Sequence, residues 1–411
     1  MSRNVYIVSA VRTPIGRFGG ALAELTAADL GVIVVREALE RAFGVPLPEP
    51  PQPGHSGEVT WSLPWRVDEL ILGNARPAGV GPNVARQVAW RAGLGDDVPA
   101  FTVNMACASG LRAILLGFQQ IRSGEADIIV AGGAESMSRV PYLLEGRWGL
   151  RMGHQPLVDA MYRDGFLCPM SQMVMGETAE LLALDYRIGR DEQDRYALES
   201  QQRAARAQKE CYFQAEIVAV ERTDRKGNVT RFDKDEHVRP ETSLDSLAKL
   251  PPVFSKTGTI TAGNSSGLTD AAAAVVLASE TKVEQLNLEP LARIVDATVA
   301  AVEPRRMGIA PVPAIRKLEL RTGWPLTQYE AIELNEAFAA QVLACDKELG
   351  FDRAALNPVG GAIALGHPIG CTGARITTTL VHTLRRERMR RGLATLCVSG
   401  GLGVAMAIEA V

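Results

Sequence analysis

The stretch ADIIVAGGAE, residues 126–135, has a counterpart near the end of the chain in ATLCVSGGLG, residues 394–403. Two further pairs follow in the same order, VDELILGN (67–74) with YEAIELNE (329–336) and ASGLRA (108–113) with CTGARI (371–376). Self-similarity in a constant order indicates a duplicated architecture. Strand-like and helical patterns alternate in both copies, so we expect two related α/β halves with mostly parallel sheets. Because ligands of such folds lie beyond the carboxyl ends of the strands, equivalent turns of the two halves are expected to face one cavity.

Local residue patterns predict the elements around these repeats. Apolar runs indicate strands at Val5–Val11, 67–74, Val98–Val103 and Ala126–Gly133, and helical spacing indicates helices at Ala27–Ala42, Asn83–Gly93, Ser109–Gln120 and Asp191–Glu210. Asp191 is the expected N-cap of the last helix, and VAVERT (218–223) with VTRF (229–232) is expected to form a hairpin. The segment Gly258–Ser279 predicts a glycine-rich loop followed by an alanine-rich helix.

Composition places the chain among globular enzymes. At roughly 100–200 residues per domain, its 411 residues predict two or three units. Hydrophobic residues make up 46%, charged residues 22%, and the formal net charge is only -3, which excludes a disordered chain. Because the sequence has neither a basic block nor an apolar run of the roughly 20 residues that a membrane span needs, no nucleic-acid or membrane partner is expected.

Cysteine usage and the first residues predict a cytoplasmic protein. The six cysteines include no CxxC pair, as is usual in a reducing compartment, and the start MSRNVYIVSAVRTPIG lacks the apolar core of a signal peptide. The segment Pro46–Pro64 carries six prolines and is expected to be a surface loop, since proline donates no backbone hydrogen bond.

Cys107, within NMACASG (104–110), is expected at a turn between a strand and a helix. Unpaired N–H groups and the positive end of the macrodipole at a helix N-terminus stabilise a thiolate, which lowers the pKa of the thiol and makes it a nucleophile. The same motif also fits a small buried side chain without chemistry, because free cysteines are usually buried and inert. The motif alone leaves both readings open.

The second half supplies its own reactive candidates beside glycines or helix starts. They are Asn335 in NEAFAAQ, His367 in GHPIGCTGA and Cys397 in CVSGGLG. A histidine between Gly366 and Pro368 is an unusual core residue, and with only five histidines in the chain it is the best candidate base. Cys371 fits packing at a helix start better than chemistry.

Four motifs, NMACASG, NEAFAAQ, GHPIGCTGAR and CVSGGLG, with GTITAGNSSGLTDAAAA upstream, resemble the thiolase family over nearly the whole chain. The resemblance implies a five-layered αβαβα fold of two related halves with an inserted loop domain. The implied units are residues 1–137 plus 269–289, the loop domain 138–268, and residues 290–411. It also implies coenzyme A thioester substrates and a homotetramer or homodimer, with no metal and no permanently bound cofactor, since coenzyme A is a substrate.

By this resemblance, Cys107 is the acylated nucleophile, His367 its activator, Cys397 the acid/base thiol, and Asn335 the residue that holds an oxyanion-hole water. The chemistry suits these residue types, because a thiolate is both a soft nucleophile and a good leaving group, and a second thiol can move a proton at the α-carbon. Backbone N–H groups of Cys107 and Ser399 are the expected second oxyanion site. Ser399 replaces a glycine that is usual in the family, which would strain it if that site needs a positive φ.

The resemblance also carries weaker expectations about substrate contacts. Arg239, Phe254 and Ser266 match positions that contact coenzyme A, and Met175 matches one near the acyl group; Ser266 could equally cap a loop and Arg239 could be a solvated charge. Val174 stands where short-chain biosynthetic members tend to carry histidine.

These expectations lead to one main activity and several alternatives. The expected activity is thiolytic cleavage of 3-ketoacyl-CoA to acetyl-CoA and a shortened acyl-CoA, in a degradative or broad-specificity role. The alternatives are a biosynthetic acetoacetyl-CoA thiolase, a ketoacyl-carrier-protein synthase, which usually pairs its cysteine with two histidines, and a non-catalytic acyl-CoA binding protein.

Overall fold

One large sheet organises the molecule. The computed structural model describes residues 3–49, 51–52, 54, 58, 65–223 and 227–411, so most of the segment Pro46–Pro64 lies outside the described residues. The strands follow the order β4 (Ala100–Val103), β3 (Glu69–Gly73), β5 (Ile128–Ser136), β12 (Thr269–Ser279), β1 (Val5–Arg12), β13 (Ala292–Ala301), β16 (Leu402–Ala410), β15 (Arg391–Val398) and β14 (Ala331–Leu334), and β2 (Gly16–Arg17) pairs with β12. The predicted repeats therefore occupy equivalent places at the two ends of the sheet.

The sheet is mixed, which corrects the expectation of mostly parallel strands. Parallel pairing is confined to β4, β3 and β5 at one end and to β14 and β15 at the other. The strands between these ends pair antiparallel, including β1 with β13, where the two halves join. The physical reason is visible at β15 and β16, where a turn of three residues leaves no room for the long crossover that parallel neighbours require.

The alanine run at residues 271–274 lies in a strand, so the predicted helix is wrong. All of β12 is buried, and its side chains alternate between two cores. Ala273 and Val275 face one hydrophobic cluster, and Ala274 and Val276 face another. A strand covered on both faces reads as a continuous apolar run without alternation, and the helix propensity of alanine is a weak preference that such burial overrides.

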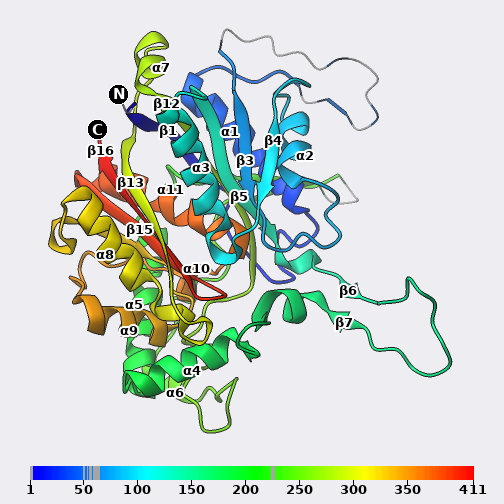
Figure 1. Cartoon of the computed structure of the whole chain (residues 1–411), viewed down its shortest axis with the longest axis vertical. Helices are drawn as coiled ribbons and strands as arrows, with labels where there is room; N and C mark the ends of the chain where they lie inside the picture. The colour runs from blue at the N-terminus through cyan, green and yellow to red at the C-terminus, as the bar shows by residue number, and fades with distance from the viewer. Residues whose placement is uncertain (1–2, 50, 53, 55–57, 59–64, 224–226) are drawn as a thin grey trace.

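Helices cover the sheet in alternating layers (Figure 1). Helices α1 (Ala27–Phe43) and α2 (Val84–Arg91) pack on the outer face of the first half, and α8 (Pro311–Thr322) and α9 (Ala339–Leu349) on that of the second. Between the halves lie α3 (Ser109–Ser123) and α11 (Ile369–Glu387), whose residues share one core with the inner faces of both halves. The result is the five-layered αβαβα arrangement.

The two middle helices cross closely because each carries a glycine at the crossing. A Cβ on Gly110 would lie 2.9 Å from the backbone nitrogen of Ala374, and one on Gly373 would lie 2.2 Å from that of Leu111. Both glycines belong to the repeated segments ASGLRA and CTGARI. The repeat therefore marks the contact that brings the start of α3 against the start of α11.

The chain between β5 and β12 wraps around one end of this core (Figure 1). It contains η2 (Met137–Arg139), the π-helical turn η3 (Tyr162–Phe166), helices α4 (Met175–Asp185), α5 (Arg190–Lys209) and α6 (Leu244–Ala248), and three short hairpins: β6 (Tyr142–Leu143) with β7 (Val158–Asp159), β8 (Leu167–Cys168) with β9 (Met173–Val174), and β10 (Val220–Thr223) with β11 (Val229–Phe232). The last hairpin confirms the predicted one.

Most remaining predicted elements are confirmed within a few residues, and one cap is not. The structure adds η1 (Ala106–Ala108), α7 (Glu280–Gln285), η4 (Pro304–Ile309), η5 (Leu326–Gln328) and α10 (Ala362–Leu365). The N-cap of helix α5 is Gly189, whose backbone is extended, and not the predicted Asp191. Asp191 lies in the first turn, where its carboxylate complements the helix dipole. Among the described residues, no helix is long and apolar enough to cross a membrane.

Candidate active site

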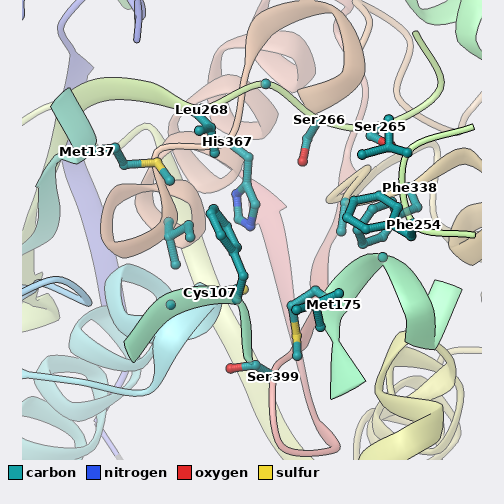
Figure 2. Close-up of a pocket in the computed structure, with 18 of the residues that line it drawn as sticks. Cys107, Met137, Met175, Phe254, Ser265, Ser266, Leu268, Phe338, His367 and Ser399 are labelled. Carbon is teal, nitrogen blue, oxygen red and sulfur yellow. The ribbon is translucent and has the colours of Figure 1, made fainter. Parts of the chain in front are cut away.

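A pocket of about 730 Å³ opens where the two halves meet the intervening segment. Its walls bring together nearly all the predicted site residues, namely Cys107, Met175, Arg239, Phe254, Ser266, His367, Cys397 and Ser399. Figure 2 shows His367 pointing into this pocket toward Cys107. The predicted Asn335 is not among the lining residues. Turns at strand ends of both halves therefore face one cavity.

Cys107 lies in the turn η1, directly before α3. The hydroxyl of Ser109 holds this turn by accepting a hydrogen bond from the N–H of Met105 at 2.9 Å and donating one to the carbonyl of Ala106 at 2.7 Å. Ala106 itself has a φ of 44°, a strained conformation for a residue with a side chain. The chain thus bends sharply to present the thiol to the pocket.

The pKa of the Cys107 thiol is raised, which corrects the expectation of a lowered value. Burial is the dominant cause and outweighs the opposing effects of the Arg76 guanidinium and of hydrogen bonds from the backbone N–H groups of Ser399 and Cys107 itself. The position before a helix is as predicted, but withdrawal from water matters more to the thiolate than the helix does. Cys107 therefore rests as a neutral thiol and needs a base to become a nucleophile.

His367 is oriented as such a base. Its Nδ1 lies 2.6 Å from Oγ1 of Thr372, whose hydroxyl in turn donates to the carbonyl of Pro368 at 3.0 Å. Because the single hydroxyl proton is already used, Oγ1 must accept from Nδ1–H, so Nε2 carries the free lone pair. Nε2 is buried and has no hydrogen-bond partner among the described residues. The neighbouring Gly366 has a φ of 103°, which only glycine adopts without strain.

Charge reinforces this assignment. Burial, followed by the nearby Arg375 and Arg76, lowers the pKa of His367 to about 3. The imidazole is therefore neutral at ordinary pH and can take a proton on Nε2. A neutral imidazole facing a neutral thiol, with N–H donors beside that thiol, is an arrangement for acyl transfer through a cysteine.

Cys397 and Ser399 come from the end of β15 and the turn after it. Burial raises the pKa of Cys397 well above its ordinary value, and the neighbouring Cys107 adds to the effect, so this thiol holds its proton. The positive φ values in the turn fall on Gly400 and Gly401, at 87° and 85°, and Ser399 is not among the residues with positive φ. The serine is therefore tolerated without strain, and its N–H still reaches Cys107.

Asn335 follows β14 and is 1% exposed. Its N–H binds the carbonyl of Thr395 at 3.0 Å, but neither polar atom of its side-chain amide has a partner within the described part of the chain. Buried amides are almost always hydrogen-bonded, so this side chain is suited to hold a water molecule. The next residue, Glu336, accepts hydrogen bonds from Tyr196 at 2.8 Å and Ser200 at 2.7 Å, which fixes the turn.

Two residues of the site escaped sequence reasoning. Glu135, the last residue of ADIIVAGGAE, accepts backbone hydrogen bonds from Ala75 at 3.0 Å and from Gly370 at 2.8 Å, and so ties the turn after β3 to the first residues of α11. Arg76 lines the pocket itself. The internal repeat could have pointed to Arg76. When Asn74 is aligned with Glu336, Arg76 falls opposite Phe338, which also lines the pocket.

The opposite side of the pocket carries the residues expected to contact coenzyme A. Ser266 points into the pocket, and the rings of Phe254 and Phe338 meet edge to face with centroids 6.2 Å apart (Figure 2). A Cβ on Gly176 would lie 2.2 Å from the ring of Phe254, so the start of α4 must be glycine there to admit it. Val174 is 8% exposed and adds an apolar surface to the wall.

Comparison with known proteins gives consistent matches over the whole chain. Residues 5–49 and 61–281 match the family model described as thiolase, N-terminal domain, and residues 288–410 match thiolase, C-terminal domain. An acetyl-CoA acetyltransferase of Chromobacterium violaceum is 48% identical over 98% of this chain and 99% of its own length.

Solved structures agree with this match. The acetyl-CoA acetyltransferase of Bacillus anthracis superposes with a TM-score of 0.93 at 44% identity, covering 100% of this chain and 99% of its own. Human mitochondrial 3-ketoacyl-CoA thiolase in complex with CoA superposes with a TM-score of 0.91 at 41% identity, covering 100% of this chain and 98% of its own.

Proposed function

Because this chain belongs to the thiolase family and is an acyltransferase, we propose that Cys107 carries the acyl group while coenzyme A thioesters react in the pocket. The observation that carries this assignment is Nε2 of His367, which has no hydrogen-bond partner in the described part of the chain and belongs to the pocket that holds the half-buried Cys107. In the acylation step, Nε2 takes the proton of Cys107 and the sulfur attacks the 3-keto carbon of the substrate. The imidazolium forms only together with negative charge on the substrate, which offsets its burial.

Cleavage of the bond between C2 and C3 then requires a proton for C2. The bond between C2 and C3 breaks, the shortened acyl group stays on Cys107, and the departing acetyl-CoA enolate takes a proton from Cys397. The high pKa of the Cys397 thiol keeps that proton available. The thiol of coenzyme A then gives its proton to the Cys397 thiolate and attacks the acyl group on Cys107. Cys107 leaves and takes back the proton held by His367, so the shortened acyl-CoA is released and both thiols are protonated again.

Negative charge develops on oxygen at two stages. The N–H groups of Cys107 and Ser399 suit the oxygen of the tetrahedral intermediates, since both favour negative charge at the Cys107 sulfur. A water held by Asn335, together with Nε2–H of His367, suits the enolate oxygen.

We place the coenzyme A moiety beside Arg239, Phe254 and Ser266, with Met175 near the acyl group. All four line the pocket, and the human relative's complex with CoA supports coenzyme A as the ligand. Coenzyme A acts there as a substrate, not as a permanently bound cofactor.

The proposed physiological direction is thiolysis of 3-ketoacyl-CoA, as in β-oxidation. Support comes from the apolar wall at Val174, where a polar histidine would favour short chains. Condensation of two acetyl-CoA is the second candidate, because the relative from Chromobacterium violaceum is named an acetyl-CoA acetyltransferase.

We further propose a homotetramer or homodimer that works in the cytoplasm. The arm between β6 and β7 projects from the body (Figure 1) and exposes large apolar side chains, Trp148 at 96% and Leu157 at 66%, which is typical of a surface buried by a partner. All six cysteines are free, which suits a reducing compartment. The pairing of β12 with β1 and β5 supports grouping residues 269–289 with 1–137, leaving 138–268 as the loop domain and 290–411 as the second half.

The test of the acyl-carrying residue is intact mass after mixing with acetyl-CoA. The wild-type protein should gain one acetyl group and the Cys107→Ala variant none. Cys211→Ala removes an exposed thiol outside the pocket and is the matched control that should still gain one. Full acetylation of Cys107→Ala would show that another residue carries the acyl group.

A further inference from the structure

Glu135 links the two halves of the protein through a single carboxylate. Its side chain lies one residue before the end of β5 and is fully buried. Oε1 accepts hydrogen bonds from the side-chain amide of Asn74 at 2.9 Å and from the N–H of Arg76 at 3.2 Å. Oε2 accepts from the N–H of Ala75 at 3.0 Å and from that of Gly370 at 2.8 Å. One oxygen therefore fixes the turn after β3, and the other fastens that turn to the start of α11.

Main chain packs directly on main chain around this carboxylate. A Cβ on Gly370 would lie 2.8 Å from Oε2 of Glu135 and 2.8 Å from the nitrogen of Ala75. A Cβ on Gly133 would lie 2.1 Å from the carbonyl oxygen of Gly370. Because both positions are glycine, no side chain separates β5 from the first turn of α11. A change in the hydrogen bonds of Glu135 would therefore move this helix start directly.

The same helix start carries the proposed base. His367 lies two residues before α11, and Thr372, which sets its tautomer, lies in the first turn of that helix. Cys107 lies on the other side of the contact, in the turn η1 before α3. The separation between base and nucleophile thus depends on how the start of α11 is held against the first half. Acyl transfer is sensitive to that separation, because a misplacement of about 1 Å can lower a rate about 100-fold.

The surroundings of Glu135 favour an anion with two equivalent oxygens. Burial raises the pKa of Glu135, and the guanidinium of Arg76 and the N–H groups of Gly370 and Ala75 act in the opposite direction. The N–H of Gly370 belongs to the first turn of α11, where N–H groups have no partner within the helix and the dipole is positive. An amide in place of the carboxylate would turn its NH₂ group toward one pair of N–H donors and leave that pair unsatisfied.

We propose that Glu135 is a positioning residue for acyl transfer, whose carboxylate holds the start of α11, and with it Nε2 of His367, within reach of the Cys107 thiol. This inference rests on the proposed acyl transfer at Cys107. Glu135 is not among the residues that line the pocket, so it acts through His367 and not by contact with the substrate. The residues expected to contact coenzyme A lie on the opposite side of the pocket, so loss of the carboxylate should slow the chemical step without weakening substrate binding.

The test is Glu135→Gln, which keeps the shape of the side chain and removes one of its two acceptor oxygens. Rapid mixing with increasing acetyl-CoA, followed by intact mass, gives the acylation rate constant at saturation and the concentration that gives half of it. The rate constant should fall about 10- to 100-fold, and the half-saturating concentration should change little. The pH profile of acylation should keep its shape, because the same thiol and imidazole exchange the proton.

Glu180→Gln is the matched control for a loss of stability alone. Both oxygens of Glu180 also accept backbone N–H groups, Oε1 from Ile260 at 2.9 Å and Oε2 from Thr259 at 2.9 Å. A Cβ on Gly258 would lie 2.1 Å from Oε1, so this carboxylate is also packed against a glycine. It ties α4 to a loop of the intervening segment and is not among the lining residues. Thermal unfolding is measured for both variants, and folded Glu180→Gln should keep an acylation rate constant close to that of the wild-type protein.

An unchanged acylation rate constant in folded Glu135→Gln overturns the proposal, and so does an equal loss in Glu180→Gln. A higher rate constant overturns it as well, since the removal of a charge near the thiol would then matter more than the position of His367. If Glu135→Gln does not fold, Asn74→Ala takes its place, because it removes one donor to Oε1 and leaves the carboxylate free to turn. Acylation should then slow several-fold, and an unchanged rate constant in that variant refutes the proposal.

Failure of this inference is distinguishable from failure of the proposed function. If the wild-type protein gains no acetyl group, the acyl transfer at Cys107 is wrong and the inference falls with it. If the wild-type protein is acetylated and Glu135→Gln is acetylated equally fast, only the role of Glu135 is wrong.

Discussion

Oγ1 of Thr372 lies 2.6 Å from Nδ1 of His367 and thereby determines which imidazole nitrogen faces the pocket. Both residues belong to GHPIGCTGAR, with His367 just before α11 and Thr372 in the first turn of that helix. The tautomer of His367 is thus set by the first turn of a helix.

Thr372→Val should therefore slow acylation while leaving the fold intact. Without the acceptor, Nδ1–H is left unpaired and the imidazole can adopt the wrong tautomer, so the acylation rate should fall about tenfold, the worth of one hydrogen bond. Rapid mixing with acetyl-CoA followed by intact mass measures the rate. Thr377→Val is the matched control, since Thr377 is also buried and also bonds the carbonyl four residues back, at 2.9 Å, but touches no histidine. Equal losses in the two variants would contradict the role of Thr372.

The pH dependence of acylation should show no inflection at the ordinary histidine pKa. In the folded chain the pKa of His367 is lowered to about 3, so the base stays neutral as the pH falls through 6.5, whereas the unfolded chain would take up a proton there. The acylation rate should be nearly flat from about pH 5 to 8, and the contribution of this histidine to stability should decline below about pH 6.5. An acid limb centred near pH 6.5 in the rate would contradict a buried neutral base.

Cys397→Ala should separate the two chemical jobs of the pocket. Acetylation of Cys107 should persist because His367 is intact, but exchange of the α-protons of acetyl-CoA with deuterated water should fall to background. Mass spectrometry of recovered acetyl-CoA measures the exchange. Cys345→Ala, which removes a thiol that is also buried but lies outside the pocket, should retain both activities. Normal condensation by Cys397→Ala would show that another group moves the proton.

The preferred acyl chain length of the substrate should depend on the pocket wall formed by Val174. An extra buried CH₂ contributes about 0.8 kcal/mol, so two more carbons could raise kcat/KM up to roughly tenfold over acetoacetyl-CoA, and 3-ketohexanoyl-CoA should be at least as good a substrate. Val174→His should reverse the order by placing a polar ring in the pocket, whereas Val174→Ile, which keeps the wall apolar, should change it less. A steep fall in kcat/KM from four to six carbons in the wild-type enzyme would favour the short-chain assignment.

Sequence patterns predicted those features that a short segment determines by itself. Cys107 and His367 lie at turns whose glycines and neighbouring strand or helix patterns are visible locally, and the repeat identified the two halves. The direction of the central strands was predicted incorrectly because pairing partners such as β1 and β13 are almost 300 residues apart. The strand in place of the alanine helix has the same origin, since its two covering layers come from α1 and α11.

The missed site residues act through partners that no local pattern reveals. The carboxylate of Glu135 accepts a hydrogen bond from the N–H of Gly370, which is 235 residues away in the sequence. The guanidinium of Arg76 donates to the carbonyl of Gly165, which is 89 residues away. The pKa of Cys107 was predicted in the wrong direction because the depth of burial is a property of the whole fold, whereas the adjacent helix start is a property of a few residues.

The crossing of α3 and α11 also sets the moment during synthesis at which the protein acquires its chemistry. Helix α3 shares the inner face of the first half's sheet with α11, so part of that face stays uncovered until residues 369–387 leave the ribosome. His367, Thr372 and Cys397 are made at the same late stage. A chain that stops short of α11 therefore leaves apolar surface exposed to water and is prone to aggregate, as incomplete folds are. Such a chain would not simply be a slower enzyme. Shielding the nascent first half until translation ends is a requirement that this shared layer imposes on the cell.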